Sequence, residues 1–251
     1  MTPTDWALEL AENPNTYVPL PVGHERVVTD RYVLYRGSAD HPAFNGAQRF
    51  RLHADEIEDA LAEIRGWFRE RDRTAYTWEV GSAAAPGDLV DRLLALGLEE
   101  DADEPLQTGM ALASPPAEPV PAGIEVRRAE SPEDRLVAAQ IAAEAFGTPV
   151  EAQPPLTTGV VVYLAYLDGE PVGRASAGFS EHGVTLFGGS TLPEARGRGA
   201  YRALVRARWD DAVARGTPLA VTQAGRHSRP ILARLGFREV CTIRALVDRF
   251  G

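Results

Sequence analysis

Residues 183–216 constrain the fold more than any other stretch of the sequence. They begin with the apolar run Val184 to Phe187, which is typical of a strand, and pass through a turn rich in glycine and arginine. Apolar residues then recur at helical spacing until Gly216, a residue type that commonly ends a helix. The stretch therefore predicts a strand, a tight turn and a long amphipathic helix. Its buried helical face is predicted to carry Tyr201, Leu204, Val205, Ala212 and Val213.

The turn itself, residues 196–200, has the chemistry of an anion site. Its glycines let the backbone approach a ligand closely and point N–H groups towards one place, where the positive end of a helix adds to the field. Arg196, Arg198 and Arg202 bring fixed positive charge that suits phosphate oxygens. The alternative is a surface turn with scattered arginines, because short glycine motifs also occur by chance.

The composition excludes several classes of phosphate-handling protein. All 26 basic residues are arginine, and the sequence contains no lysine. P-loop nucleotide sites, kinase-type phosphoryl transfer and Schiff-base enzymes each need a lysine, so these readings of the glycine turn are excluded. A net charge of -10 argues against a general nucleic-acid binder, because neutralising phosphates needs a basic surface.

The remaining composition is that of an ordinary globular chain, with 44% hydrophobic and 25% charged residues. The single cysteine, Cys241, excludes an internal disulfide framework and is predicted to lie in the core. No signal peptide opens the sequence and no apolar run reaches membrane length, so we expect a cytoplasmic protein without a membrane partner.

Residues 192–200 resemble the acyl-CoA pyrophosphate loop of the GNAT superfamily of N-acyltransferases, whose pattern is Arg/Gln-x-x-Gly-x-Gly/Ala. Arg196 and Gly199 match this pattern, whereas Tyr201 occupies the sixth position, where the family has a small residue. Downstream, a predicted strand and a short helix end in Leu235-Gly236-Phe237, which is similar to the end of the family's last helix. The resemblance covers residues 123–251.

The resemblance implies an acyltransferase that uses acetyl-CoA, or another acyl-CoA, as co-substrate and needs no metal. By the same resemblance, backbone groups near the end of the central strand align the pantetheine arm and the acyl carbonyl, and the turn holds the pyrophosphate. The pair Gly188-Gly189 permits the strand to splay and open a slot. The implied CoA-binding residues are Ser190, Thr191, Leu192, Arg196, Gly197, Arg198, Gly199, Ala200 and Tyr201.

The acid and base of the reaction are less clear in the sequence. Leu232 stands where many members of the family have the tyrosine that protonates the departing thiolate. His227 or Ser228 can supply a proton instead, although Ser228 can equally serve as a helix cap and His227 as a solvated side chain. The central strand offers no Glu, Asp or His as a base. Candidates on the substrate side come from flanking segments: Glu144, Glu181 and His182.

The first half of the chain repeats the order of elements found in the second half. Helix 55–71, strand 75–80 and helix 88–96 parallel helix 200–215, strand 219–223 and helix 228–235. Asp55 and Glu56 stand at the helix entrance of the first copy, where carboxylates repel a pyrophosphate. The first copy is therefore predicted to bind no CoA and to serve as scaffold or as a wall of the substrate pocket.

These observations predict an α/β fold with a mixed sheet, built from two GNAT-like units in tandem. The expected division is a degenerate unit at 1–112, a proline-rich linker at 113–122 and the acyl-CoA unit at 123–251. Further expected elements are a helix at 4–12, strands at 31–36, 48–52, 107–112 and 124–128, a helix at 134–146 capped by Ser131, a loop at 150–159, a hairpin at 160–180 and a last strand at 239–247.

Three functions fit the sequence. The first is acylation of a small-molecule amine. The second is a non-catalytic regulatory or scaffold protein that binds acyl-CoA, suggested by the missing tyrosine. The third is acetylation of a protein or peptide, which an open groove would favour over a closed pocket. The identity of the amine, the acyl group and the oligomeric state are not encoded in any motif.

Overall fold

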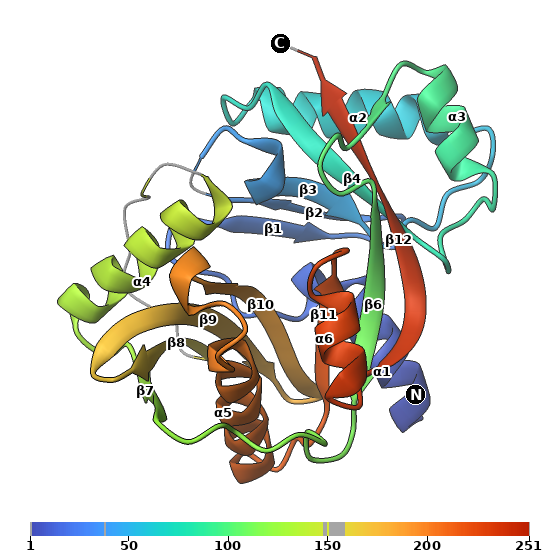
Figure 1. The fold of residues 1–251 in the computed structure, drawn as a ribbon. Helices are drawn as coiled ribbons and strands as arrows, with labels where there is room; N and C mark the ends of the chain where they lie inside the picture. The colour runs from blue at the N-terminus through green and yellow to red at the C-terminus, as the bar shows by residue number, and fades with distance from the viewer. Residues whose placement is uncertain (1, 38, 148–149, 151–158, 251) are drawn as a thin grey trace. The chain divides into compact units, whose positions relative to one another are not determined.

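The computed structural model describes residues 2–37, 39–147, 150 and 159–250 (Figure 1). Contacts divide the chain into two compact units that are not simple halves of the sequence. The first comprises Met1–Gly109, Gln223–Arg229 and Glu239–Gly251, and the second comprises Met110–Thr222 and Pro230–Arg238. The final strand therefore belongs by its contacts to the first unit.

The first unit contains a sheet with the strand order β1-β2-β3-β4-β12, and β5 also pairs with β12. Strands β3 and β4 run parallel, whereas the neighbouring pairs are antiparallel. The elements are α1 (Pro3–Glu12), η1 (Pro14–Thr16), β1 (Glu25–Val28), β2 (Val33–Arg36), η2 (Pro42–Phe44), β3 (Asn45–Gln48), α2 (Ile57–Arg69), β4 (Ala75–Gly81), α3 (Leu89–Ala95), β5 (Glu99–Glu100) and β12 (Arg238–Arg249).

The core of this unit lies between the sheet and the apolar face of α2. Phe50 and Trp78 stack at its centre with their ring centroids 4.4 Å apart. The predicted helical face is buried as expected, and each such side chain contributes about 1.5–3 kcal/mol relative to an exposed one. Its residues are Ile57, Leu61, Ile64 and Phe68.

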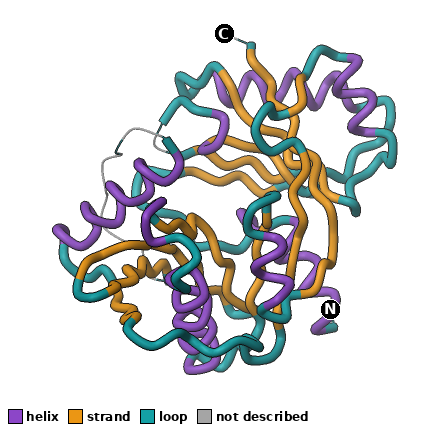
Figure 2. Tube along the Cα trace, in the orientation of Figure 1, coloured by secondary structure: helices purple, strands orange, loops and turns teal. Residues whose placement is uncertain are grey.

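The second unit has the strand order β11-β10-β9-β8-β7, with β10 and β11 parallel and the other pairs antiparallel. Parallel and antiparallel pairs thus occur in both units, and the predicted mixed α/β architecture is confirmed. Figure 2 shows the helices and strands by colour along the chain. The elements are β7 (Ile124–Arg128), α4 (Pro132–Phe146), β8 (Val160–Leu167), β9 (Glu170–Ser180), β10 (Gly183–Thr191), η3 (Pro193–Ala195), α5 (Ala200–Ala214), β11 (Ala220–Ala224) and α6 (Arg229–Arg234). Strand β6 (Leu106–Leu112) has residues in both units, as do β11 and α6, whose residues Gln223, Ala224 and Arg229 belong to the first unit.

Helix α4 begins as the sequence predicts. The Ser131 hydroxyl accepts a hydrogen bond from the backbone N–H of Asp134, and the Asp134 carboxylate accepts one from the N–H of Ser131. This reciprocal capping box satisfies two N–H groups that would otherwise lack partners at the start of the helix. Gly147 follows the helix in the left-handed conformation, with φ 68°.

The predicted buried face of α5 needs a correction. Val213 is 48% exposed, whereas Arg208 is buried and Trp209 is also buried. Arg208 lies one turn from Leu204 and from Ala212, so it belongs to the same helical stripe as these two apolar residues. The sequence pattern missed it because a charged residue is not expected on a buried face.

Most predicted elements occur, and one strand is displaced. The strand expected at 48–52 is instead β3, which ends at Gln48 because Arg49 takes a positive φ of 60°. Strand β1 was not expected. Cys241 is buried, as predicted. The expected loop at 150–159 lies outside the described residues apart from its two ends. No helix in the described part of the chain is long and apolar enough to cross a membrane.

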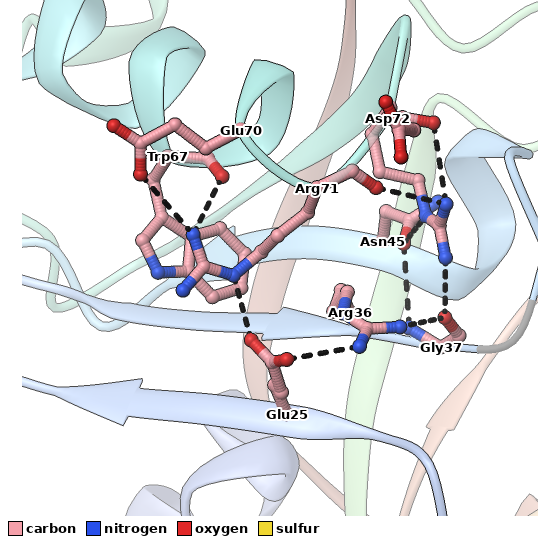
Figure 3. A network of polar contacts seen from close by, with 9 residues as sticks. Glu25, Arg36, Gly37, Asn45, Trp67, Glu70, Arg71 and Asp72 are labelled. Atoms are coloured by element: carbon pink, nitrogen blue, oxygen red, sulfur yellow. Dashed lines mark hydrogen bonds and ion pairs between the residues drawn. The ribbon is translucent and has the colours of Figure 1, made fainter.

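A polar network ties the strands of the first unit to the end of α2 (Figure 3). The Glu25 carboxylate on β1 accepts hydrogen bonds from Arg36 on β2 at 2.9 Å and from Arg71, beyond α2, at 2.6 Å. These bonds from Arg36 and Arg71 lower the pKa of the Glu25 carboxyl below its usual value. Arg71 also lies over the Trp67 ring, 4.1 Å from its centroid. The network serves to hold the unit together.

The last strand is fixed to the first unit by an ion pair with a buried carboxylate. Asp248 on β12 is 1% exposed and accepts two hydrogen bonds of 2.8 Å from the Arg65 guanidinium on α2. Replacing Asp248 by alanine leaves Arg65 without this partner, so we expect the free energy of unfolding in urea to fall by about 1–3 kcal/mol.

Asp210→Ala is the matched control for Asp248→Ala. Asp210 pairs with Arg206 one turn away on the exposed surface of α5. Such surface pairs contribute little, so the loss should be under about 0.5 kcal/mol. Equal losses in the two variants would contradict the placement of β12 against α2.

Candidate functional site

The distinctive feature of the second unit is a bulge in β10. Phe187 on β10 pairs with Ser176 on β9, and the next pair joins Ser190 to Arg174. These two pairs are three residues apart on β10 but only two residues apart on β9. The extra residue breaks the ladder at the predicted pair Gly188-Gly189.

Both glycines of the bulge are required by their surroundings. Gly188 has φ 57°, and a Cβ atom there would lie 2.2 Å from Nη1 of Arg174. A Cβ atom on Gly189 would lie 2.9 Å from the Tyr201 ring. Side chains at these two positions would therefore displace the groups that surround the bulge.

Strand β10 loses its parallel neighbour just before the bulge. It pairs with β11 only at Val184 and Thr185, and the Thr222 hydroxyl then donates to the carbonyl of Leu186 at 2.9 Å. From Phe187 onward, no ladder with β11 is present among the described residues. Backbone polar groups along this edge of β10 are thus available to a ligand.

The corresponding place in the first unit is closed. Strands β3 and β4 pair through Gln48 and Glu79, and the parallel pairing resumes with a bridge between Arg51 and Ala85. The Leu52 N–H donates to the Ala85 carbonyl, and the Ala85 N–H donates to Phe50, both at 3.1 Å. The backbone groups that are open in the second unit are therefore used within the first.

The turn after β10 leads into α5, whose N-terminal N–H groups are not capped by a side chain. Gly199 precedes the helix with φ 98°, and Gly197 has φ 77°. The helix has no side-chain cap and no acidic residue in its first turn. In the described chain α1, α2, α3 and α4 all carry acidic residues there. The positive end of α5 is thus left for an external anion.

The arginines of the turn are not equally free. Arg196 is exposed, and its Nε lies 3.4 Å from the Thr191 carbonyl. Arg198 makes a long exposed contact of 3.4 Å with Asp168. Arg202 is committed more firmly, because its Nη1 donates to the Glu118 carboxylate at 2.7 Å. Arg196 and Arg198 are therefore better placed than Arg202 to meet a phosphate.

The half-buried Arg174 and the buried Arg208 meet at the bulge, and the sequence pattern predicted neither. Arg174 on β9 donates from Nη1 to the Gly188 carbonyl and from Nη2 to the Ser176 hydroxyl, both at 2.8 Å. Arg208 on α5 donates from Nε to the Leu204 carbonyl at 2.9 Å and from Nη1 to the Ser176 carbonyl at 3.2 Å. A signal was present in the sequence, since Arg208 falls on the apolar stripe of its helix.

Burial changes the titration of these two groups. It lowers the pKa of Arg174 to about 10, helped by repulsion from Arg208. Burial also lowers the pKa of Arg208 to about 10. Both guanidinium groups remain charged at neutral pH. Tyr201 lies beside them, and burial raises the pKa of its hydroxyl.

The residues predicted for catalysis and substrate binding lie in several places. His227 is exposed and accepts a hydrogen bond from Arg226 at 3.2 Å, and the Ser228 hydroxyl donates to the Gly225 carbonyl at 3.4 Å. By contacts, both belong to the first unit. Glu144 is exposed on α4.

His182 and Glu181 lie in the turn that precedes β10. At about 3.3 Å per residue, this places them about 25 Å along the strand from Ser190. Leu192 begins the loop at the other end, and its N–H already donates to the Val172 carbonyl at 2.9 Å. Among the described residues, no group of three His, Cys, Asp or Glu side chains is arranged to hold a metal ion.

Comparison with known proteins places this geometry in context. No family model matches the sequence, and no curated protein matches it. A solved GCN5-related N-acetyltransferase from Kribbella flavida is 22% identical with a TM-score of 0.71, covering 100% of this chain and 96% of that one. This chain has the GNAT fold.

The GNAT fold extends over the whole chain in a tandem form. A tandem GNAT protein from the clavulanic acid biosynthesis pathway superposes with a TM-score of 0.59 at 16% identity, covering 99% of this chain and 95% of that one. A GCN5-related N-acetyltransferase from Sphaerobacter thermophilus gives 0.60 at 16% identity, with 89% and 82% covered. The predicted resemblance and tandem fold are confirmed.

The two glycines of the turn provide a test of its conformation. Both have positive φ, so alanine at either position costs about 1–2 kcal/mol of backbone strain. A Cβ on Gly197 meets nothing within 4 Å, but a Cβ on Gly199 lies 2.4 Å from Pro121. We expect Gly199→Ala to weaken acetyl-CoA binding in calorimetry by about tenfold more than Gly197→Ala. The reverse order would show that the turn does not adopt this conformation when a ligand binds.

Proposed function

We propose that the protein is an acyl-CoA-dependent N-acyltransferase that transfers an acetyl group to a small-molecule amine. The observation that carries the proposal is the continuous path in the second unit from the broken ladder of β10, through the glycine–arginine turn, to the uncapped start of α5. The open edge of β10 suits a polar chain of acyl and amide groups, and the turn at the start of α5 suits a diphosphate.

In the proposed complex, the diphosphate of CoA binds at the turn. The backbone N–H groups of the first turn of α5 form the positive end of the helix, and the exposed Arg196 and Arg198 guanidinium groups add charge. The open edge of β10 near Ser190 and Thr191 aligns the thioester and polarises its carbonyl. Acyl-CoA supplies the activated carbonyl that the amine attacks.

The proposed acid is His227, with Ser228 as the alternative. The attacking amine has to lose a proton and the departing thiolate has to gain one. Leu232, at the position of the family's tyrosine, is 1% exposed and carries no proton to donate. His227 and Ser228 are polar groups at the beginning of α6, next to the end of β11. Of the substrate-side residues, His182 lies before β10, at the opposite end of the strand from the loop, and Glu144 is exposed on α4.

The first unit acts in this proposal as a scaffold without CoA. Its backbone ladder continues where β10 is open, and its helix entrance is occupied by the Glu56 carboxylate, which accepts from the N–H of His53 at 2.7 Å. The proposed domain pattern remains two repeats, 1–112 and 123–251, joined by the linker 113–122, with the final strand contributing its contacts to the first unit.

A second candidate is an acyl-CoA-binding regulatory or scaffold protein without catalysis. The observation that favours it is the buried Leu232 in place of an acid, together with a β10 that carries no Glu, Asp or His. Both functions require the CoA site. When amines are added to acetyl-CoA, only the acyltransferase should release free thiol, so this assay distinguishes the two.

Arg196 provides a test of the CoA site. If its guanidinium binds the diphosphate, Arg196→Ala should raise the Kd for acetyl-CoA by about 10- to 100-fold, the usual loss for a charge-assisted hydrogen bond. Arg206→Ala is the control, because Arg206 pairs with Asp210 on the exposed surface of α5. Calorimetry that gave one Kd for both variants would remove Arg196 from the site.

His227 provides a separate test of catalysis. If it is the acid, His227→Ala should lower kcat by about 100- to 10,000-fold and leave the KM for acetyl-CoA nearly unchanged. Ser228→Ala, assayed by the same thiol release, tests the alternative. An unchanged kcat in both variants would exclude the two residues as proton donors.

A further inference from the structure

The charge at the β10 bulge is not balanced by any carboxylate that the structure describes. Arg174 and Arg208 bond only to backbone carbonyls and to the Ser176 hydroxyl. The two acids that follow Arg208 on α5 are already paired, Asp210 with Arg206 and Asp211 with Arg128 and the Tyr163 hydroxyl. A buried positive charge such as Arg208 is costly without a carboxylate partner, and repulsion from the half-buried Arg174 adds to the cost.

Arg174 still has hydrogen-bonding capacity. Two of the five N–H donors of a guanidinium are used by the Gly188 carbonyl and the Ser176 hydroxyl. Its Nε is sealed from solvent and has no partner among the described residues. The guanidinium is therefore held in place by two bonds, and because the residue as a whole is half-buried, the remaining N–H groups on Nη1 and Nη2 can still donate to another acceptor.

A second unsatisfied group lies directly opposite Arg174. Ser190 pairs with Arg174 across the β9–β10 ladder, so both side chains lie on the same face of the sheet. Ser190 is 6% exposed, and its hydroxyl has no hydrogen-bond partner in the described chain.

This face is the one that α4 covers. Leu164 and Val162 on β8 pack in the core with α4, and they lie opposite Arg174 and Ser176 on β9. Arg208 approaches from the other side, since α5 carries it, and its guanidinium reaches the Ser176 carbonyl. The bulge thus brings together two cations and a free hydroxyl at the point where β10 lacks its parallel neighbour.

We propose that this cluster recognises a carboxylate on one of the two substrates, with Arg174 and Ser190 as the groups that contact it and Arg208 as the supporting charge. A carboxylate matches the planar fork of a guanidinium and also accepts from a hydroxyl. The inference rests on the proposed acyl transfer, because it assigns a chemical class to a substrate of the same site. It adds that the enzyme prefers an amino acid over a plain amine, or a dicarboxylic acyl-CoA over acetyl-CoA.

The experiment separates these two sources of the carboxylate. Acetyl-CoA, malonyl-CoA and succinyl-CoA are compared as donors by calorimetry and by thiol release. Amino acids are compared as acceptors with their α-amides, which keep the amine and lose the charge. The same titrations are run with amino acids and with succinate in the absence of CoA.

The variants are Arg174→Gln, Arg174→Lys and the control Arg206→Gln. Arg174→Gln should reduce the ratio of activity on the carboxylate-bearing substrate to activity on its uncharged counterpart by about 10- to 100-fold. Arg174→Lys keeps the charge without the fork and should restore part of the preference. Arg206→Gln should change neither the binding nor the reaction of either member of each substrate pair. A merely structural role for Arg174 would weaken both members of each pair alike.

The possible failures are distinguishable. If acetyl-CoA binds and reacts, but carboxylated and uncharged substrates behave alike in the wild type, the inference is wrong and the acyltransferase proposal stands. If no acyl-CoA binds, the proposed function fails. In that case, binding of an amino acid or succinate that Arg174→Gln abolishes still supports the carboxylate site, and its absence overturns it.

Discussion

Every buried backbone N–H and carbonyl needs a hydrogen-bond partner, and this requirement determines where the second unit can bind a ligand. Strand β10 satisfies that need on one side through β9 and leaves it open on the other beyond Leu186. The break is sustained locally, because Gly188 and Gly189 leave room for the Arg174 guanidinium and the Tyr201 ring. The turn and the uncapped start of α5 also leave backbone groups without partners. Together with β10 they form a surface whose unpaired groups a long, amide-containing anion can satisfy.

The two units have the same order of elements, and a few residue differences distinguish the proposed ligand site of the second from the scaffold role of the first. Both contain a strand, a turn, a helix and a parallel neighbouring strand in the same order. In the first unit Ala85 completes the ladder, Phe50 and Trp78 fill the space with stacked rings, and acidic residues occupy the start of α2. In the second unit glycines replace side chains and arginines replace acids, so the equivalent groups stay open.

The sequence predicted what depends on neighbours along the chain. The glycine–arginine turn, the helices and the Ser131 cap all follow from local patterns, and they appear where expected. It could not predict what depends on distant partners. The half-buried Arg174 and the buried Arg208 owe their roles to a bulge that joins β9, β10 and α5, and a charged side chain gives no hydrophobic signal. The displaced strand near Gln48 has the same origin, since the positive φ of Arg49 reflects packing and not propensity.

The place of the last strand bears on how the chain is made. Strand β12 lies antiparallel to β4 and carries Asp248 to Arg65, yet it follows all the other described helices and strands along the sequence. Until β12 is made, the nascent first unit presents one edge of β4 without a neighbour, a surface prone to wrong pairing. The first unit therefore cannot close until β12 has been synthesised, whereas all residues of the second unit precede Glu239 and can fold before that point.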